Sequence, residues 1–205
     1  MSGTTTLVWF RRDLRLSDNP ALTAAVADSD HVVAAYVHAP EEESPWLPGA
    51  ASRWWLHHSL AALATTLRQK GIALTLRRGP ALPALSELAN EVGATRVAWN
   101  RLYDPATVAR DTAVKTGLRD LGFECESYNA NLLHEPWEIR TGQGGPYRVF
   151  TPFWRACQMR LDAQPAPLPA PRRLHGPSQP IASLALDELD LLPTIPWDAA
   201  FSQHW

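Results

Sequence analysis

Short apolar runs alternate with helical segments along the first 128 residues. The first run covers residues 5–10 and ends abruptly where four charged residues, Arg11, Arg12, Asp13 and Arg15, fall within five positions. An apolar run that breaks into charges predicts a buried strand whose carboxyl end leads into a polar loop. The same reasoning predicts strands at residues 5–10, 31–37, 72–76, 96–99 and 123–128, and helices at residues 20–27, 50–70, 82–91, 105–121 and 151–161.

This alternation predicts the fold class. Parallel strands need crossover connections, and right-handed helical crossovers cover both faces of the sheet. We therefore expect an α/β fold with a doubly wound, five-stranded parallel sheet and helices on both faces. Ligands of such sheets bind outside the carboxyl ends of the strands, which is where the charged loop after Phe10 is expected. The alternative is that Arg12 and Asp13 simply pair across the turn.

The character of the chain changes after Tyr128. Residues 1–130 are predicted to form the α/β domain, and residues 131–162 a loop and helix that complete it. Residues 163–205 are predicted to be a linker, because six prolines fall between residues 164 and 180 and favour an extended spacer. The chain ends on aromatic residues without closing a unit, so we expect it to stop before a further domain.

Composition narrows the function classes. With 45% hydrophobic residues in 205 positions the chain can bury a core, and its formal charge of −2 gives no electrostatic case for a nucleic-acid binder. Only Cys125 and Cys157 are present, which predicts a reducing compartment and no disulfide framework, and no cysteine or histidine has metal-ligand spacing. No apolar stretch of about 18 residues or leader pattern is visible, so we expect a cytoplasmic protein without a membrane partner.

Nucleotide-binding signatures are also missing. Neither Gly-x-Gly-x-x-Gly nor a P-loop pattern follows the first strand, which leaves a pocket for a flat molecule with polar edges. On the helix at residues 50–70 the periodicity cannot bury both Trp54 and Trp55, so one of them is expected in the core. Arg53, one turn from the start of that helix, fits a core poorly and is the strongest single candidate for touching a ligand.

Two dense motifs carry a family resemblance. They are VWFRRDLRLSDN at residues 8–19 and PYRVFTPFW at residues 146–154, supported by AASRWWLHHSL at 50–60, WNR at 99–101 and LLHEP at 132–136. In this order and separation they resemble the amino-terminal α/β domain of the DNA photolyase and cryptochrome family, over essentially the whole chain. The likeness is greatest to bacterial relatives of the plant cryptochrome group. The resemblance implies the strand order 3-2-1-4-5 and a crevice over residues 10–13 and 100–104.

The resemblance also implies a function. In this family the amino-terminal domain holds a light-harvesting pigment, while a following helical domain holds FAD and takes up damaged DNA. The intact parent is expected to be a deoxyribodipyrimidine photo-lyase that splits cyclobutane pyrimidine dimers by electron transfer from reduced FAD. The alternatives are the same domain of a cryptochrome photoreceptor and a stand-alone nucleotide-binding or interaction module.

The division between the two domains also determines which partners this chain is expected to have. FAD and DNA contacts belong to the helical domain, so no catalytic residue is expected in this chain, and damaged DNA is a partner of the intact parent alone. Residues 150–154 and 197–205 are expected to form apolar surfaces that face the second domain. Through them the isolated chain is expected to self-associate.

The pigment is expected to be methenyltetrahydrofolate, with deazaflavin and FMN as alternatives. The Asn-Glu pair of better-known folate-binding photolyases aligns with Ala106 and Thr107, and the carboxylate of deazaflavin-binding relatives aligns with Leu102, so neither standard pocket is intact. A rearranged site is therefore expected, in which Trp46 stacks on the ring, Asp104 accepts its N–H donors and arginines meet its polar ends. The predicted pigment-binding residues are Phe10, Arg11, Trp46, Arg53, Asn100, Arg101 and Asp104.

Overall fold

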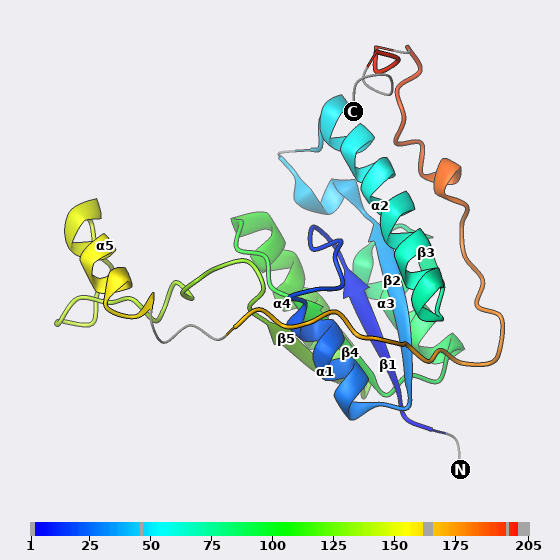
Figure 1. Cartoon of the computed structure of the whole chain (residues 1–205), viewed down its shortest axis with the longest axis horizontal. Coiled ribbons are helices and arrows are strands. Elements are labelled where there is room, and N and C mark those ends of the chain that lie inside the picture. Colours follow the sequence, from blue (N-terminus) through cyan, green and yellow to red (C-terminus); the bar gives the residue numbers. More distant parts are fainter. Residues whose placement is uncertain (1–2, 46, 162–165, 196, 201–205) are drawn as a thin grey trace.

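Five parallel strands form one sheet with β1 at its centre. The computed structural model describes residues 3–45, 47–161, 166–195 and 197–200. Its strand order is β3-β2-β1-β4-β5, and every neighbouring pair is parallel, so the predicted sheet and its order are confirmed (Figure 1). The strands are β1 (Thr5–Phe10), β2 (His31–His38), β3 (Leu74–Arg78), β4 (Arg96–Asn100) and β5 (Glu124–Tyr128).

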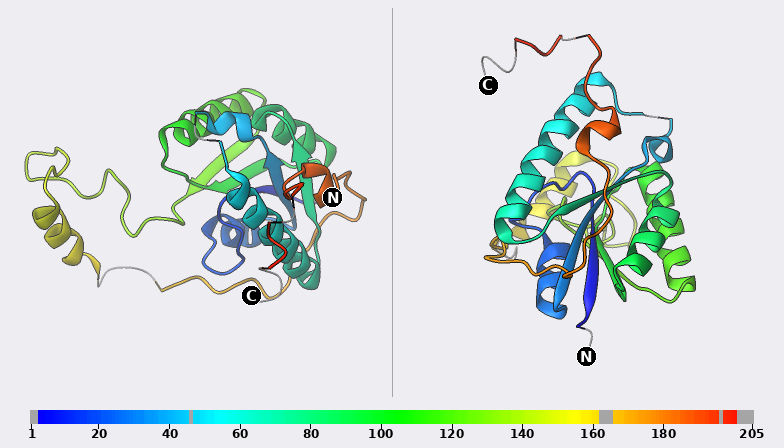
Figure 2. Two further views of the ribbon diagram at one scale, coloured as in Figure 1. Left: turned by 90° about the horizontal axis from the view of Figure 1, so that it is seen from above. Right: turned by 90° about the vertical axis from the view of Figure 1, so that its right-hand side faces the viewer.

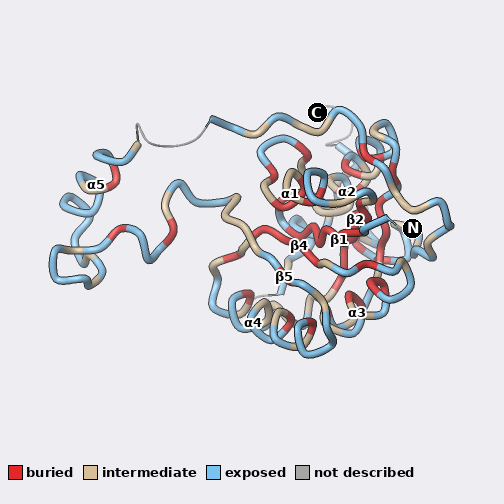
Figure 3. Tube along the Cα trace, turned by 90° about the horizontal axis from the view of Figure 1, so that it is seen from below, coloured by how far each residue is buried: buried red, intermediate tan, exposed pale blue. Residues whose placement is uncertain are grey.

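Helices cover both faces of this sheet, as predicted. α1 (Pro20–Asp28) and α2 (Ala50–Lys70) cover one face, and α3 (Ala81–Glu91) and α4 (Pro105–Asp120) cover the other. The remaining helices are α5 (Phe150–Gln158) and the short 3-10 helices η1 (Pro40–Glu43) and η3 (Leu186–Leu189). Alternate residues of β1 point to opposite faces. Val8 and Phe10 pack with α1 and α2, whereas Leu7 and Trp9 pack with α3 and α4. Figure 3 shows this buried interior along the central strands.

Some element boundaries differ from the prediction for local reasons. β3 begins at Leu74 rather than at residue 72, because Gly71 ends α2 in a left-handed conformation and the Ile72 amide bonds back to the Leu67 carbonyl at 3.1 Å. β3 also runs two residues further than predicted, to Arg78. Between β2 and α2, η1 forms one short turn.

Neither tryptophan of α2 lies in the core, so the expectation that one of them is buried is wrong. Trp55 is 62% exposed. Trp54 is half-buried, and its indole Nε1 donates to Asp198 at 2.8 Å while its ring lies 6.4 Å from that of Trp197. The buried stripe of α2 is instead Leu60, Leu63 and Leu67.

The carboxyl-terminal segment runs across the domain and back along α2 (Figure 2). Apart from η3, its described residues form no helix or strand, and backbone hydrogen bonds fix it to the domain. The Asp18 amide donates to Leu168, the Leu174 amide to Lys70, and the Leu184 amide to Leu76. Because Leu174, Leu189 and Leu191 are also buried, this segment contributes to the hydrophobic core.

Residues 129–158 leave the sheet, and α5 stands away from it (Figure 1). Among the residues that the structure describes, no helix is long and apolar enough to cross a membrane.

Gly71 gives a direct test of how this segment is held. Its φ is 111°, and an added Cβ would lie 2.7 Å from the Leu174 carbonyl oxygen. We expect Gly71→Ala to lower the free energy of unfolding by about 1–3 kcal/mol, from left-handed strain and displacement of the segment. Urea unfolding measures the change. Gly49→Ala is the control, because no atom lies within 4 Å of a Cβ there. Equal losses in the two variants would contradict this account.

Candidate functional site

A buried polar junction joins the carboxyl ends of β1 and β4. The Arg11 guanidinium is 5% exposed, donates to Asp111 on α4 at 2.6 Å and also donates to the Asn100 carbonyl. The Asn100 amide donates to Asp13 at 2.5 Å and to Asn19 at 2.8 Å. Arg11 and Asn100 were predicted to bind a ligand, and here they connect β1 to β4 and α4.

Arg12 does not pair with Asp13. Its guanidinium donates to Glu43 at 2.9 Å and to Asp104 at 2.7 Å, and these contacts raise its pKa although partial burial lowers it. Asp13 instead accepts from the Arg11 backbone amide at 2.9 Å. The charged loop thus carries one inward network through Asp13 and one outward network through Arg12.

A cleft of about 1050 Å³ opens at the carboxyl ends of β1, β2 and β3. Its walls come from the β1 loop, η1, the first turns of α2 and the segment after η3. Its polar and aromatic lining includes Trp9, Arg11, Arg12, Tyr36, His38, Glu41, Arg53, Trp55, Arg78, Arg110 and Asp190. The crevice was predicted to lie over the ends of β1 and β4. The observed cleft lies over the ends of β1, β2 and β3 instead.

Trp9 lies at the base of the cleft between two cations, and it is only 1% exposed. The Arg11 Cζ lies 4.5 Å from its ring centroid and the Arg110 Cζ lies 5.1 Å from it. The indole Nε1 of Trp9 and the Nε of Arg11 are buried, and neither has a hydrogen-bond partner in the described part of the chain. Buried donors are normally satisfied, so these two are exceptions that lack an acceptor among the described residues.

Most cations of the cleft have carboxylate partners. Arg110 lies 3.0 Å from Asp111, and Arg78 lies 3.0 Å from Asp190. Arg53 is different, because its exposed side chain makes no hydrogen bond or ion pair with any described residue. Burial, with Arg78 and Arg53 as positive neighbours, lowers the pKa of His38, so its imidazole is neutral at neutral pH.

A second, separate hollow of about 380 Å³ lies between α4, the ends of β4 and β5, and Trp137. Arg101, which was predicted to share the first crevice, lies here and pairs with the buried Glu135. No residue lines both cavities.

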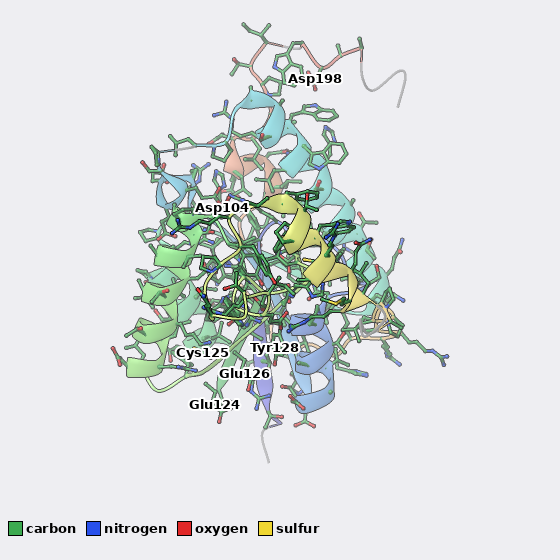
Figure 4. The ribbon with its side chains drawn as sticks, turned by 90° about the vertical axis from the view of Figure 1, so that its left-hand side faces the viewer. Asp104, Glu124, Cys125, Glu126, Tyr128 and Asp198 are labelled. Atoms are coloured by element: carbon green, nitrogen blue, oxygen red, sulfur yellow. The ribbon has the colours of Figure 1, made fainter. Side chains whose placement is uncertain are left out.

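The remaining predicted residues are scattered. Phe10 is fully buried in the core, and Trp46 lies outside the described residues. Asp104 is 57% exposed, pairs with Arg12, lines neither cavity and lies at the η1 end of α4 (Figure 4). Of the predicted residues that the structure describes, it therefore places only Arg11 and Arg53 in the cleft.

Sequence reasoning missed several residues of the cleft. His38 and Arg78 are the last residues of β2 and β3. The rule that ligands bind at the carboxyl ends of strands would have found them if both strands had been predicted to end at these residues. Arg110 carries no such signal, because it reaches the cleft from α4. Among the described residues no group of three metal-ligating side chains occurs, and both cysteines are buried.

Asn100 allows a test of the polar junction. In Asn100→Asp, a carboxylate replaces the amide that donates to Asp13 and Asn19, so two buried carboxylates face each other. We expect a loss of about 3–5 kcal/mol in the free energy of unfolding at neutral pH, which shrinks toward acid pH as the new carboxyl is protonated. Urea unfolding from pH 4 to pH 8 measures it. Asn90→Asp, on the exposed side of α3, is the control. A loss that does not depend on pH would show that carboxylate repulsion is not the cause.

Three comparisons place this geometry among known proteins. The family model "DNA photolyase" matches residues 6–172. Deoxyribodipyrimidine photo-lyase of Agrobacterium fabrum is 47% identical over 97% of this chain, which spans 41% of that protein. Cryptochrome-2 of Arabidopsis thaliana is 41% identical over 91% of this chain, which spans 31% of that protein.

Comparison with solved structures identifies the same family. The crystal structure of a bacterial class III photolyase from Agrobacterium tumefaciens superposes with a TM-score of 0.91 and 45% identity, covering all of this chain and 42% of that one. The chain thus spans less than half the length of these relatives. It belongs to the DNA photolyase family and matches the amino-terminal part of its members.

Proposed function

We propose that this chain is the light-harvesting domain of a DNA photolyase and that its cleft holds a flat, light-absorbing heterocycle. The observation that carries the proposal is the cleft itself, in which arginine side chains and buried, unpartnered donors meet at the carboxyl edge of the sheet. Its volume of about 1050 Å³ is large enough for a pigment of several rings.

The residues of the cleft fit a pterin with an anionic tail. The unpartnered donors of Trp9 and Arg11 suit the carbonyl and ring-nitrogen acceptors of a pterin. Glu41 is an exposed carboxylate of the lining and suits the amino and N–H donors, a role for which Asp104 is poorly placed because it pairs with Arg12 outside the cleft. Arg53, without an acidic partner, suits a carboxylate tail.

Methenyltetrahydrofolate is the pigment that we favour, with deazaflavin and FMN as the alternatives. Thr107, which aligns with the Glu of the better-known folate sites, is 1% exposed and donates to the Asp104 carbonyl at 2.9 Å. Leu102, at the deazaflavin-binding position, is 8% exposed. Both side chains are buried in the fold and do not face an open pocket of the standard kind, which supports a rearranged site. A bound pigment would absorb near-ultraviolet light and pass its excitation energy to a flavin.

The domain boundaries remain part of the proposal. The α5 face carries Phe150 and Trp154, which are 71% and 41% exposed and whose rings are stacked 6.3 Å apart. An exposed aromatic pair on a helix that stands away from the sheet supports a docking role toward the helical FAD domain of the intact parent. Trp197 is 41% exposed but contacts Trp54, and residues 201–205 lie outside the described residues.

Titration with methenyltetrahydrofolate tests the proposed site. We expect the near-ultraviolet absorption of the pigment to shift on binding to the 205-residue chain, and Arg53→Gln to weaken binding about tenfold by removing a charge-assisted hydrogen bond. Arg68→Gln, in the last turn of the same helix, is the control. Equal affinities of wild type and Arg53→Gln, or tighter binding of FMN or a deazaflavin, would contradict the folate assignment.

A repair assay tests the parent activity. We expect the complete gene product that contains this chain to remove cyclobutane pyrimidine dimers from DNA under blue light, and to leave them intact in the dark. A cryptochrome photoreceptor is the alternative, since a cryptochrome is also among the relatives. A flavin-loaded, photoreduced protein that leaves dimers unrepaired would favour that alternative.

A further inference from the structure

The second hollow is not used by the proposed pigment site. It is lined by Trp99, Arg101, Leu102, Tyr103, Val108, Asp111, Thr112, Lys115, Thr116, Arg119, Ser127 and Trp137, and we call it the α4 hollow. One wall is a single face of α4, because residues 108, 112, 115, 116 and 119 follow helical spacing.

The α4 hollow holds more positive than negative charge. Lys115 donates to the Ser127 hydroxyl at 3.3 Å and Arg119 donates to the Cys125 carbonyl at 3.1 Å, so both have neutral partners. Neither makes an ion pair with a carboxylate among the described residues. Asp111, the one carboxylate of the lining, is already engaged by Arg11 and Arg110.

The positive charges in this hollow repel one another. Burial, followed by the positive charges of Arg119 and Arg101, lowers the pKa of Lys115. A bound anion would relieve this repulsion and would replace neutral acceptors with charged ones. The hollow is therefore suited to an anion.

An aromatic surface borders the same cations. The indole of Trp137 is 52% exposed, and the Arg101 Cζ lies 5.9 Å from its ring centroid. Arg101 is held in place by the buried carboxylate of Glu135, which also accepts from the Tyr103 hydroxyl at 2.8 Å. An exposed indole beside a fixed guanidinium is a platform on which a planar ring can stack.

We propose that the α4 hollow binds a nucleoside phosphate, with the phosphate at Lys115 and Arg119 and the base on Trp137. The volume of about 380 Å³ suits a mononucleotide. The hydroxyls of Thr116 and Ser127 supply neutral donors for the phosphate oxygens or the ribose. This site is independent of the cleft, since the two share no lining residue.

Calorimetric titration of the 205-residue chain with adenosine 5′-monophosphate tests the proposal. We expect one saturable site whose affinity falls at high salt, and about tenfold weaker binding in Lys115→Gln and in Arg119→Gln. Lys70→Gln, at the end of α2, is the matched control and should bind as wild type does. Trp137→Ala should weaken binding of the nucleotide and leave binding of inorganic phosphate unchanged.

A substitute variant and a second ligand complete the binding experiment. If Lys115→Gln unfolds, Thr116→Glu replaces it, because that exposed position places a negative charge at the rim and should abolish binding. Adenosine without phosphate should bind far more weakly than the nucleotide. The proposal is overturned if no saturable binding occurs, if adenosine binds equally well, or if the α4 variants bind as the control does.

Discussion

The buried contact between Arg11 and Asp111 is the interaction on which the functional edge of this domain depends. Moving two charges into a protein interior costs several kcal/mol for each ion, and the cost is recovered only with good geometry and satisfied neighbours. Both conditions hold, because Arg11 also donates to the Asn100 carbonyl while Asn100 bonds Asp13 and Asn19. Removing any one of these groups would leave a buried polar atom unpaired.

This constraint divides the polar residues at the strand ends into two classes. Residues of the junction fix the relative positions of β1, β4 and α4, and their hydrogen-bonding capacity is largely consumed. Ligand binding is left to the unpartnered Nε of Arg11 and to groups around the junction, such as Arg53 in the cleft and Lys115 in the α4 hollow, which have no carboxylate partner among the described residues. The half-buried Asp111 lies between the two cavities, since its Arg11 and Arg110 partners line the cleft while it lines the hollow.

The fold could be predicted from sequence because its signals are local. The apolar run at Thr5–Phe10, the cap at Asn19 and the stop at Gly71 each act within a few residues. The site could be predicted only in part, because its assignments depend on contacts between distant residues. Arg101 turns to Glu135, 34 positions away, and Trp54 is covered by Asp198, 144 positions away. Neither contact produces a periodic pattern in the sequence. The rule that ligands bind at strand ends therefore placed Arg101 in the cleft rather than in the α4 hollow, and helical periodicity wrongly placed one α2 tryptophan in the core.

The central claim is that the light-absorbing ligand lies in the cleft over β1, β2 and β3, although most of the predicted binding residues lie elsewhere. A crystal structure of the chain grown with methenyltetrahydrofolate tests this most directly. The account predicts electron density for a pterin ring in this cleft, with its tail toward Arg53. Density for the pigment in the α4 hollow, or on the outer surface beside Asp104, would contradict it.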